Sequence, residues 1–341
     1  MVAPAGDMAV RVARPNDAEA VCALADAFGA GLTNLPADRQ VLAERFEASM
    51  ALLEAPRAGV QTPLSLVLEV DGRIAGIGAV FPAIGVSWPF YSYKINRLSQ
   101  TSRQVGRSVA YRILTLTNDL DGAAEMACLL VDPTLRGGGA GRLMARSRYL
   151  FMAAHRALFG DQVIAEIRGW HDAAGASPVW EAIGRRFYDM SFEEADRISG
   201  ASGGQFIADL GPRYPIYANL LPEAAQAALG RPHENSAPAY RLLIEEGFRY
   251  DGYVDIFDGG PTVTAHIDEL KAVRDARRRR VSDVRSLDEA TPEHLVCAGR
   301  GAEFRAARGA LRAEGQGAIL SPALAKALRV GPAEEICHVR F

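Results

Sequence analysis

The sequence predicts an α/β fold in which helices flank a mixed sheet, and three features of the chain indicate it. Strand-like apolar runs alternate with helix-like segments over the first half of the chain. Asp71-Gly72 separates two apolar segments, the pattern of a tight antiparallel hairpin. A third apolar segment leads through an arginine and a glycine cluster at residues 136–141 into a helical pattern.

The elements before the glycine cluster follow from local signals. Pro15 and the polar residues after it can cap a helix, with Asn16 or Asp17 as the N-cap. Gly and Asp at the hairpin adopt the positive φ angles that a two-residue turn needs. The expected elements, in chain order, are a strand at 9–13, a helix to about Phe28, the loop GLTNLP, a helix at about 37–53, strands at 65–70 and 73–81, and extended stretches at 91–98 and 109–117.

The glycine cluster follows a central strand at residues 125–131 and precedes a helix at about 141–159, after which a strand is expected at 163–167. A strand that hands over to a helix leaves several backbone N–H groups pointing at one spot. The helix dipole adds partial positive charge there, so an anion is the natural occupant. Consecutive glycines are entropically costly unless the backbone must approach something closely.

The residues of the glycine cluster do not match two well-known phosphate-binding loops. A nucleoside-triphosphate loop needs Lys and then Ser or Thr after its last glycine, and neither residue is present. The dinucleotide pattern Gly-x-Gly-x-x-Gly fits only if Arg142 replaces the last small residue. The spacing Arg136-x-x-Gly139-x-Gly141 instead resembles the pyrophosphate loop of the GCN5-related N-acyltransferases, which use acyl-coenzyme A. The resemblance implies that loop amides hold the pyrophosphate and that the preceding strand offers backbone groups to the thioester.

Two segments in the middle of the chain share a weak sequence pattern, which we call the internal echo. Residues 177–192 and 236–254 each begin with a serine near a proline, continue as a short amphipathic helix and include aromatic residues at the end. The echo indicates either a duplicated half-domain or an insertion. The expected domains are an acyl-coenzyme A-binding core at 1–200, a second acyltransferase-like segment at 201–280 that completes the active site, and a small β-rich domain at 281–341, with a short helix in SPALAKALRVGP and a final strand in EEICHVRF.

Composition narrows the class of protein. The 341 residues carry a formal net charge of −3, which argues against a nucleic-acid-binding protein. The arginines at residues 277–280 are expected on the solvated face of a helix. No apolar stretch is long enough to span a membrane and no signal peptide is recognisable, so a cytoplasmic protein is expected. The scattered Cys and His residues suggest neither a disulfide framework nor a metal site, and Cys128 is expected to be a core residue.

A longer resemblance covers residues 10–280. The chain is similar to the arginine N-succinyltransferase family in the ordered segments GLTNLP, LTNDLDG, LMARSRYLFMAAHR, SPVWEAIGRRFYDMSFEEAD, PIYANLL, HENSAPAYRLLIEEGFRY and DIFDGGP. The resemblance implies transfer of a succinyl group from succinyl-coenzyme A to the α-amino group of L-arginine, and the scattered Cys and His residues predict that the enzyme needs no metal. The resemblance also implies a homo-oligomer or association with a related subunit. Three alternatives stay open. The acceptor could be ornithine or another amine, the donor could be acetyl-coenzyme A, and the chain could be a non-catalytic partner subunit that binds coenzyme A.

The reaction needs a proton donor for the thiolate, N–H donors for the tetrahedral intermediate and charged groups for the two substrates. The resemblance implies that His233 is the proton donor; His155 and His171 are expected to be structural or solvent-facing. Lys94, Arg97 or Arg168 could hold the succinyl carboxylate. The other candidates are Leu129, Leu130, Val131, Arg136, Gly137, Gly138, Gly139, Ala140 and Gly141 for coenzyme A, and Glu125, Glu166, Asp255 and Asp258 for the arginine substrate.

Overall fold

The computed structural model describes residues 7–28, 35–202 and 204–341. Most of the predicted loop GLTNLP, residues 31–34, lies outside these ranges. The chain divides into two compact units, and each is described by itself. The first unit comprises Met1–Ala83, Ala124–Asp161 and His266–Phe341, and the second comprises Ile84–Ala123 and Gln162–Ala265.

The first unit has a sheet whose strands follow the order β12, β15, β11, β14, β13, β1, β2, β3 and β6. Its central part is antiparallel, since β2 pairs with β1 and β3, and β3 pairs with β6. Leu42 and Phe46 are fully buried against this sheet, together with Val67 and Ile77. The elements of this part are β1 (Met8–Val12), α1 (Ala18–Phe28), α2 (Arg39–Glu54), β2 (Leu64–Val70), β3 (Arg73–Phe81), β6 (Ala124–Val131), α3 (Ala140–Ala154) and α9 (Lys271–Arg274).

The turn between β2 and β3 confirms the hairpin that the sequence predicts. Asp71 has a φ of 49° and Gly72 a φ of 78°, so both central residues take the left-handed conformation of a two-residue turn. The N-terminal helices and strands also begin and end close to the predicted residues. Local signals in the sequence therefore determine this part of the sheet.

Five C-terminal strands of the first unit close on themselves. β12 pairs with both β15 and β13, while β11 joins β15 to β14 and β14 pairs with β13. The ring encloses a core that includes Val296, Leu311 and Ile336, and Leu324 and Leu328 of a short helix pack against it. The elements are β11 (Arg277–Val284), β12 (Glu293–Ala298), β13 (Arg305–Glu314), β14 (Gly317–Leu320), α10 (Pro322–Leu328) and β15 (Glu335–Arg340).

The arginines at residues 277–280 lie in β11, so the prediction of a helix there is wrong. Arg277 to Arg280 pair with His338 to Glu335 of β15 in antiparallel register. Arg279 donates hydrogen bonds to the carbonyl of Gly315 and to His338 Nε2. Four charged residues in a row carry no helical or strand periodicity of their own, and the pairing with β15 and β14 decides the conformation.

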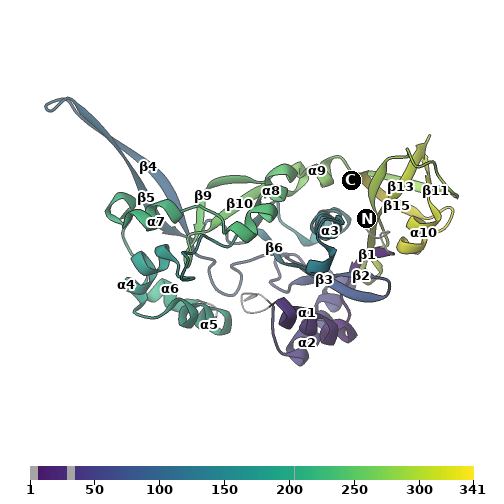
Figure 1. The fold of residues 1–341 in the computed structure, drawn as a ribbon, viewed down its shortest axis with the longest axis horizontal. Helices are drawn as coiled ribbons and strands as arrows, with labels where there is room; N and C mark the ends of the chain where they lie inside the picture. The colour runs from purple at the N-terminus through teal and green to yellow at the C-terminus, as the bar shows by residue number, and fades with distance from the viewer. Residues whose placement is uncertain (1–6, 29–34, 203) are drawn as a thin grey trace. The chain divides into compact units, whose positions relative to one another are not determined.

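The second unit has its own sheet, in the order β7, β10, β9, β4, β5 and β8. β4 and β5 form a long hairpin whose far end projects beyond the rest of this unit (Figure 1). The base of the hairpin packs into a core with Tyr93, Leu114 and Val254. The strands are β4 (Ser92–Ser102), β5 (Arg107–Thr117), β7 (Gln162–Glu166), β8 (Ile216–Tyr217), β9 (Arg249–Asp255) and β10 (Pro261–His266), and the helices of eight or more residues are α5 (Phe192–Ser202) and α8 (Ala237–Glu246).

The two segments of the internal echo fold differently. Residues 236–254 form α8 and β9. Residues 177–192 instead contain the π-helical turn Trp180–Gly184 and the short α4 (Arg185–Tyr188), with no strand after them. Trp180 is fully buried and stacks on Tyr188 and Phe257, which fixes this segment as part of an aromatic core.

The fold class is therefore the one that the sequence predicts: a mixed sheet with flanking helices and a small β-rich C-terminal region. The order of strand, helices, hairpin, strand, glycine loop and helix is the order expected of an acyltransferase of the GCN5-related type. None of the helices in the described ranges has the length and apolar character needed to cross a lipid bilayer.

Candidate functional site

Strand β6 carries a bulge just before the glycine loop. Ile77 of β3 pairs with Leu130, but Ala79 pairs with Ala127, so Cys128 and Leu129 together stand opposite a single residue of β3. Cys128 has a φ of 50°, which is uncommon for a residue other than glycine. A bulge bends its strand and interrupts the hydrogen-bond ladder at the extra residue. Backbone groups at Cys128 and Leu129 are thereby turned away from regular pairing with β3.

A buried arginine supports the bulge from helix α3. Arg148 is 3% exposed, and its Nη1 donates to the carbonyl oxygens of Ala127 at 3.0 Å and Ala79 at 3.4 Å. Burial lowers the pKa of this guanidinium. A Cβ atom on Gly78, opposite the bulge, would lie 2.8 Å from Met144 Cε and 3.1 Å from Arg148 Cδ. Glycine at 78 therefore allows α3 to pack closely on the irregular part of the strand.

The glycine loop follows directly. Asp132 caps the short turn Pro133–Leu135 by accepting a hydrogen bond from the Thr134 N–H at 2.9 Å. Gly137 and Gly139 have φ angles of 82° and 83°, a conformation that favours glycine. Gly139 is the N-cap of α3, whose first backbone bond runs from the Leu143 N–H to the Gly139 carbonyl at 2.8 Å.

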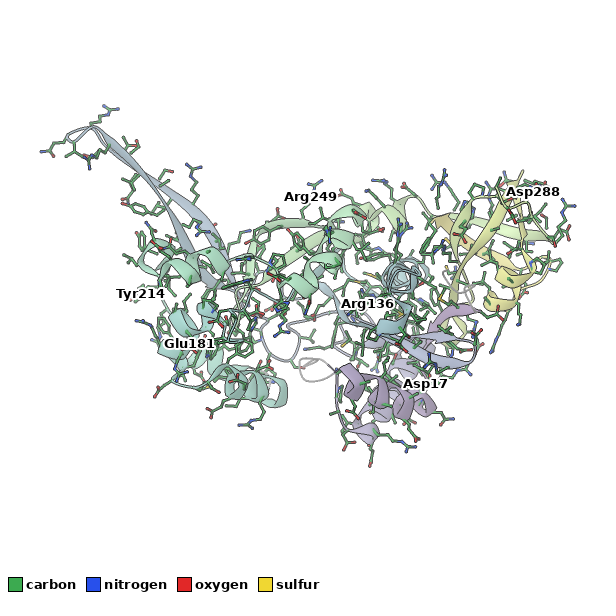
Figure 2. The ribbon with its side chains drawn as sticks, in the orientation of Figure 1. Asp17, Arg136, Glu181, Tyr214, Arg249 and Asp288 are labelled. Atoms are coloured by element: carbon green, nitrogen blue, oxygen red, sulfur yellow. The ribbon has the colours of Figure 1, made fainter. Side chains whose placement is uncertain are left out.

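The N–H groups before Leu143 have no partner within the helix, so they are available to an anion. Arg136, labelled in Figure 2, is exposed at the start of this loop. The glycines leave the loop without side chains that would cover these donors. The loop is therefore suited by its shape and its donors to hold a phosphate group.

Glu125 lies near the beginning of the same strand and is 8% exposed. Burial raises its pKa from 4.5 to about 7. The charges of Glu125, Arg45 and Arg148 all act on the Cys128 thiol, whose pKa burial raises to about 11. Because its pKa lies near neutrality, Glu125 can accept or release a proton at physiological pH.

His233, in the second unit, is held by two short backbone segments that pair with each other. The His233 N–H donates to the Arg168 carbonyl at 2.8 Å, and the Trp170 N–H donates to the Arg231 carbonyl at 3.0 Å. The Arg231 guanidinium lies over the Trp170 ring at 4.7 Å. The segment that follows β7 therefore fixes the backbone of His233.

The imidazole of His233 has a defined hydrogen-bonding pattern. Its Nδ1 accepts from the Asn235 N–H at 3.1 Å, so the proton of the neutral ring resides on Nε2. Burial and the positive charge of Arg168, with a contribution from His171, lower the pKa of His233. The ring of His171 lies 6.1 Å from that of His233. Near neutral pH the Nε2 of His233 is thus a hydrogen-bond donor.

Asp255 and Asp258 organise a tight turn in the second unit. Asp255 Oδ1 accepts from the N–H groups of Phe257 and Asp258, both at 2.8 Å. Asp258 is 7% exposed, and its two oxygens accept separately from Gly169 at 2.7 Å and Gly260 at 2.8 Å. Burial and the neighbouring Asp258 raise the pKa of Asp255. Through Gly169, Asp258 ties this turn to the segment that supports His233.

Other charged candidates have more ordinary surroundings. Lys94 Nζ donates to the Asp251 carbonyl at 2.5 Å and lies over the Tyr253 ring. Arg97 and Arg168 are exposed, and Glu166 ends β7 half-buried. Among the residues of the described ranges, no group of three or more His, Cys, Asp or Glu side chains could hold a metal ion.

The structure groups the predicted residues by unit. Glu125, the residues from Leu129 to Val131 and the glycine loop belong to the first unit, whereas His233, Glu166, Asp255 and Asp258 belong to the second. Sequence reasoning missed Arg148 and the proximity of His171 to His233. The position of His171 after a strand end was the one sequence signal for its proximity to His233. No sequence signal indicated the buried position of Arg148. His155 is structural, as expected, since its Nε2 accepts from the Gly301 N–H at 2.8 Å.

Comparison with known proteins extends these observations. The family model of the arginine N-succinyltransferase beta subunit matches residues 8–272, and the model of its C-terminal domain matches residues 277–340. The arginine N-succinyltransferase of Citrobacter koseri is 37% identical to this chain over 336 residues, with 98% of each protein covered. That of Enterobacter sp. (strain 638) is 38% identical over 301 residues, with 88% of each covered.

A solved structure agrees with these matches. Arginine/ornithine succinyltransferase subunit AI from Pseudomonas aeruginosa has 33% sequence identity and a TM-score of 0.85, with 98% of each chain covered. The similarity thus includes the glycine loop, the His233 segment and the C-terminal strands.

Proposed function

This chain belongs to the arginine N-succinyltransferase family, and from that premise we propose that it transfers the succinyl group of succinyl-coenzyme A to the α-amino group of L-arginine. The chain is an acyltransferase, as its relatives are. The amine nitrogen attacks the thioester carbonyl, a C–N bond forms, the C–S bond breaks, and the amine loses a proton while the thiolate gains one. Coenzyme A and N-succinylarginine leave.

The observation that carries the proposal is the bulged strand followed by the glycine loop. The positive φ angles of Gly137 and Gly139 and the free N–H groups at the start of α3 suit a pyrophosphate. The bulge at Cys128 and Leu129 interrupts the regular pairing with β3 at the point where the acyl part of the substrate would lie. The candidate residues for coenzyme A are therefore the main chain of Leu129, Leu130 and Val131 and the loop from Arg136 to Gly141.

We assign three roles in the reaction. Backbone N–H groups at Leu129 and Leu130 stabilise the oxyanion of the tetrahedral intermediate. His233 donates a hydrogen bond from Nε2 to the sulfur and stabilises the negative charge that develops there, which agrees with the Asn235 N–H occupying its Nδ1; the released thiolate takes its proton from water. Glu125 accepts the proton of the α-amine, directly or through water, because its pKa of about 7 keeps it partly ionised at neutral pH.

Recognition of the acceptor is assigned to acidic residues. Glu166, Asp255 and Asp258 are the candidates for the guanidinium of arginine, whereas Glu125, the other acidic candidate from the sequence, is assigned to the α-amine. Asp258 already accepts two backbone hydrogen bonds, so its part is to shape the turn on which Asp255 lies. Lys94, Arg97 or Arg168 would pair with the succinyl carboxylate.

The wider assignments belong to the same proposal. Residues 1–200 would act as the acyl-coenzyme A-binding core, 201–280 as the segment that completes the active site, and 281–341 as an accessory domain. We place the protein in the cytoplasm, as a homo-oligomer or in association with a related subunit. Ornithine is the second acceptor to test, because the Pseudomonas aeruginosa relative is described as an arginine/ornithine succinyltransferase.

The decisive experiment is mass detection of the product formed by the purified chain. Succinyl-coenzyme A and acetyl-coenzyme A are each offered with arginine, ornithine and lysine, and the acylated amino acid is quantified. We expect succinylarginine as the main product. Faster acetyl transfer, or a preference for ornithine, would replace the corresponding substrate in the proposal, and a chain that binds coenzyme A without turnover would be a partner subunit.

A further inference from the structure

A cavity of about 860 Å³ opens beside the glycine loop within the first unit. Gly137, Gly138, Gly139 and Arg142 line one side of it. The other side consists of residues from the C-terminal β-rich region, including Arg308 of β13 and Arg340 at the end of β15. Its volume lies in the range of pockets that hold cofactors and small ligands.

The C-terminal region directs an arginine against the glycine loop. A Cβ atom on Gly139 would lie only 2.7 Å from Arg308 Nη1, so the guanidinium rests on the backbone of the loop. Arg308 is oriented by an ion pair with Glu293 and by the ring of Phe341, whose centroid lies 4.6 Å from its Cζ. The guanidinium is therefore held in place rather than free in solvent.

Two more arginines surround the same ring. Arg142 and Arg146 of α3 lie over Phe341 at 5.2 Å and 5.8 Å, and Arg146 Nη1 donates to the Arg340 carbonyl at 2.9 Å. Among the described residues, neither Arg142 nor Arg340 forms an ion pair with a carboxylate. Two carboxylate side chains line the cavity, and each has a cationic partner: Asp7 pairs with Lys326 and Glu293 with Arg308. Three arginine side chains therefore line the cavity, and those of Arg142 and Arg340 have no carboxylate partner among the described residues.

We propose that the C-terminal β-rich region binds the nucleotide end of coenzyme A, with Arg308 and Arg142 contacting its 3′-phosphate. This inference rests on the proposed function and extends the binding site beyond the acyltransferase core. The backbone amides of the glycine loop suit the pyrophosphate. The 3′-phosphate is a separate dianionic group on the same nucleotide, and guanidinium groups bind phosphate through paired N–H···O bonds. The position of Arg308 against Gly139 places such a group next to the loop.

The test compares coenzyme A with dephospho-coenzyme A, which differs only by lacking the 3′-phosphate. Dissociation constants of both ligands are measured calorimetrically for the wild-type chain, for Arg308→Gln and Arg142→Gln, and for Arg312→Gln as a matched control. Arg312 lies on the same strand as Arg308 but pairs with Glu314 and does not line the cavity. A charge-assisted contact to phosphate corresponds to about tenfold or more in affinity.

We expect the wild-type chain and Arg312→Gln to bind coenzyme A at least about tenfold more tightly than dephospho-coenzyme A. Arg308→Gln should lose most of this preference by weakening only the binding of coenzyme A. Equal binding of the two ligands by the wild-type chain overturns the inference without any variant. Equal weakening of both ligands in Arg308→Gln also overturns it, because Arg308 would then support the loop or the pyrophosphate.

The same titrations separate this inference from the proposed function. A wild-type chain that binds neither ligand and forms no succinylarginine contradicts the proposed function itself. A chain that forms succinylarginine but ignores the 3′-phosphate contradicts only the assignment of Arg308 and Arg142. Thermal unfolding of each variant without ligand shows whether it is folded, and Arg308→Lys, which keeps the positive charge, should retain part of the preference for coenzyme A.

Discussion

The glycine-loop region of the first unit and the His233 region of the second are built by opposite means. The first is made of main chain: a bulge at Cys128, two glycines with positive φ and the beginning of α3. The second is made of side chains, in which Asp258 and Asp255 accept backbone hydrogen bonds and His233 presents Nε2. The first region is suited to anions, whereas the second carries carboxylates and a titratable imidazole.

This difference teaches where sequence changes should act. A main-chain site depends on φ angles and close packing, so substitutions within the glycine loop affect it mainly where they disturb the backbone. A side-chain site loses its chemistry when a substitution removes a single functional atom. Changes in the glycine-loop region should therefore alter the affinity for acyl-coenzyme A, and changes in the His233 region should alter turnover.

The largest expected effect is on turnover, in His233→Ala. We expect kcat to fall by about 10²- to 10⁴-fold, the range for removal of a general acid or base, while the Kd for coenzyme A stays unchanged. Steady-state kinetics and calorimetry check the two quantities. His171→Gln serves as the control, since it removes the neighbouring ring and leaves His233 in place. Turnover near the wild-type value in His233→Ala would show that the chemistry does not use this imidazole.

Glu125→Gln tests the one side chain of the first region to which we assign a chemical role, although that region is otherwise made of main chain. The pKa of Glu125 is raised to about 7, so kcat/KM should rise with pH up to about 7 in the wild-type chain and lose this limb in the variant. We expect kcat/KM at pH 8 to fall by about 10²-fold. A variant with the wild-type pH profile would remove Glu125 from the mechanism.

The same residue makes a prediction about stability. The folded chain binds the Glu125 proton more tightly than the unfolded chain does, because the folded pKa is about 7 and the reference value 4.5. This contribution is complete below the unfolded pKa and is lost as the pH rises to 7, at a cost of about 3 kcal/mol. Urea unfolding at pH 5 and pH 8 should show the dependence in the wild-type chain and its reduction in Glu125→Gln.

Gly139→Ala should weaken the binding of coenzyme A by about tenfold, which is the effect expected when a loop donor shifts. Alanine at a φ of 83° costs about 1–2 kcal/mol, and its Cβ would meet Arg308. The matched control for stability is Gly138→Ala, whose Cβ would have only the Leu135 carbonyl oxygen nearby, at 3.4 Å. Equal unfolding midpoints for the two variants would contradict the proposed strain.

The smallest expected effects are on stability, and they should differ between Asp258→Asn and Asp255→Asn. Asp258 uses both oxygens as acceptors, so Asp258→Asn turns an NH₂ group toward a backbone N–H and should cost about 1–3 kcal/mol of stability. Asp255 accepts both of its bonds through Oδ1, which an asparagine can reproduce, and its pKa is already raised. Asp255→Asn should therefore change the free energy of unfolding by less than about 1 kcal/mol. Thermal or urea unfolding distinguishes them, and the reverse ranking would contradict this account of the turn.

The sequence predicts the elements that depend on neighbouring residues. The Asp71-Gly72 turn, the strands around it, the helix after the glycine loop and α10 follow from turn residues, caps and periodicity. The arginines at 277–280 have no such pattern, and only the partners β14 and β15 make them a strand. Cys297 and Cys337, far apart in the chain, lie opposite each other on β12 and β15 for the same reason.

The candidate site divides in the same way. The sequence by itself determined the glycine loop, because φ angles and free N–H groups are local properties of a strand that ends in glycines and leads into a helix. Resemblance to a family, rather than spacing, singled out His233. Only the tertiary structure decided that Arg148 lies under the bulge, that His171 approaches His233 and that Arg308 rests on Gly139. These contacts join residues remote in sequence, and they depend on packing, which no local pattern of residues encodes.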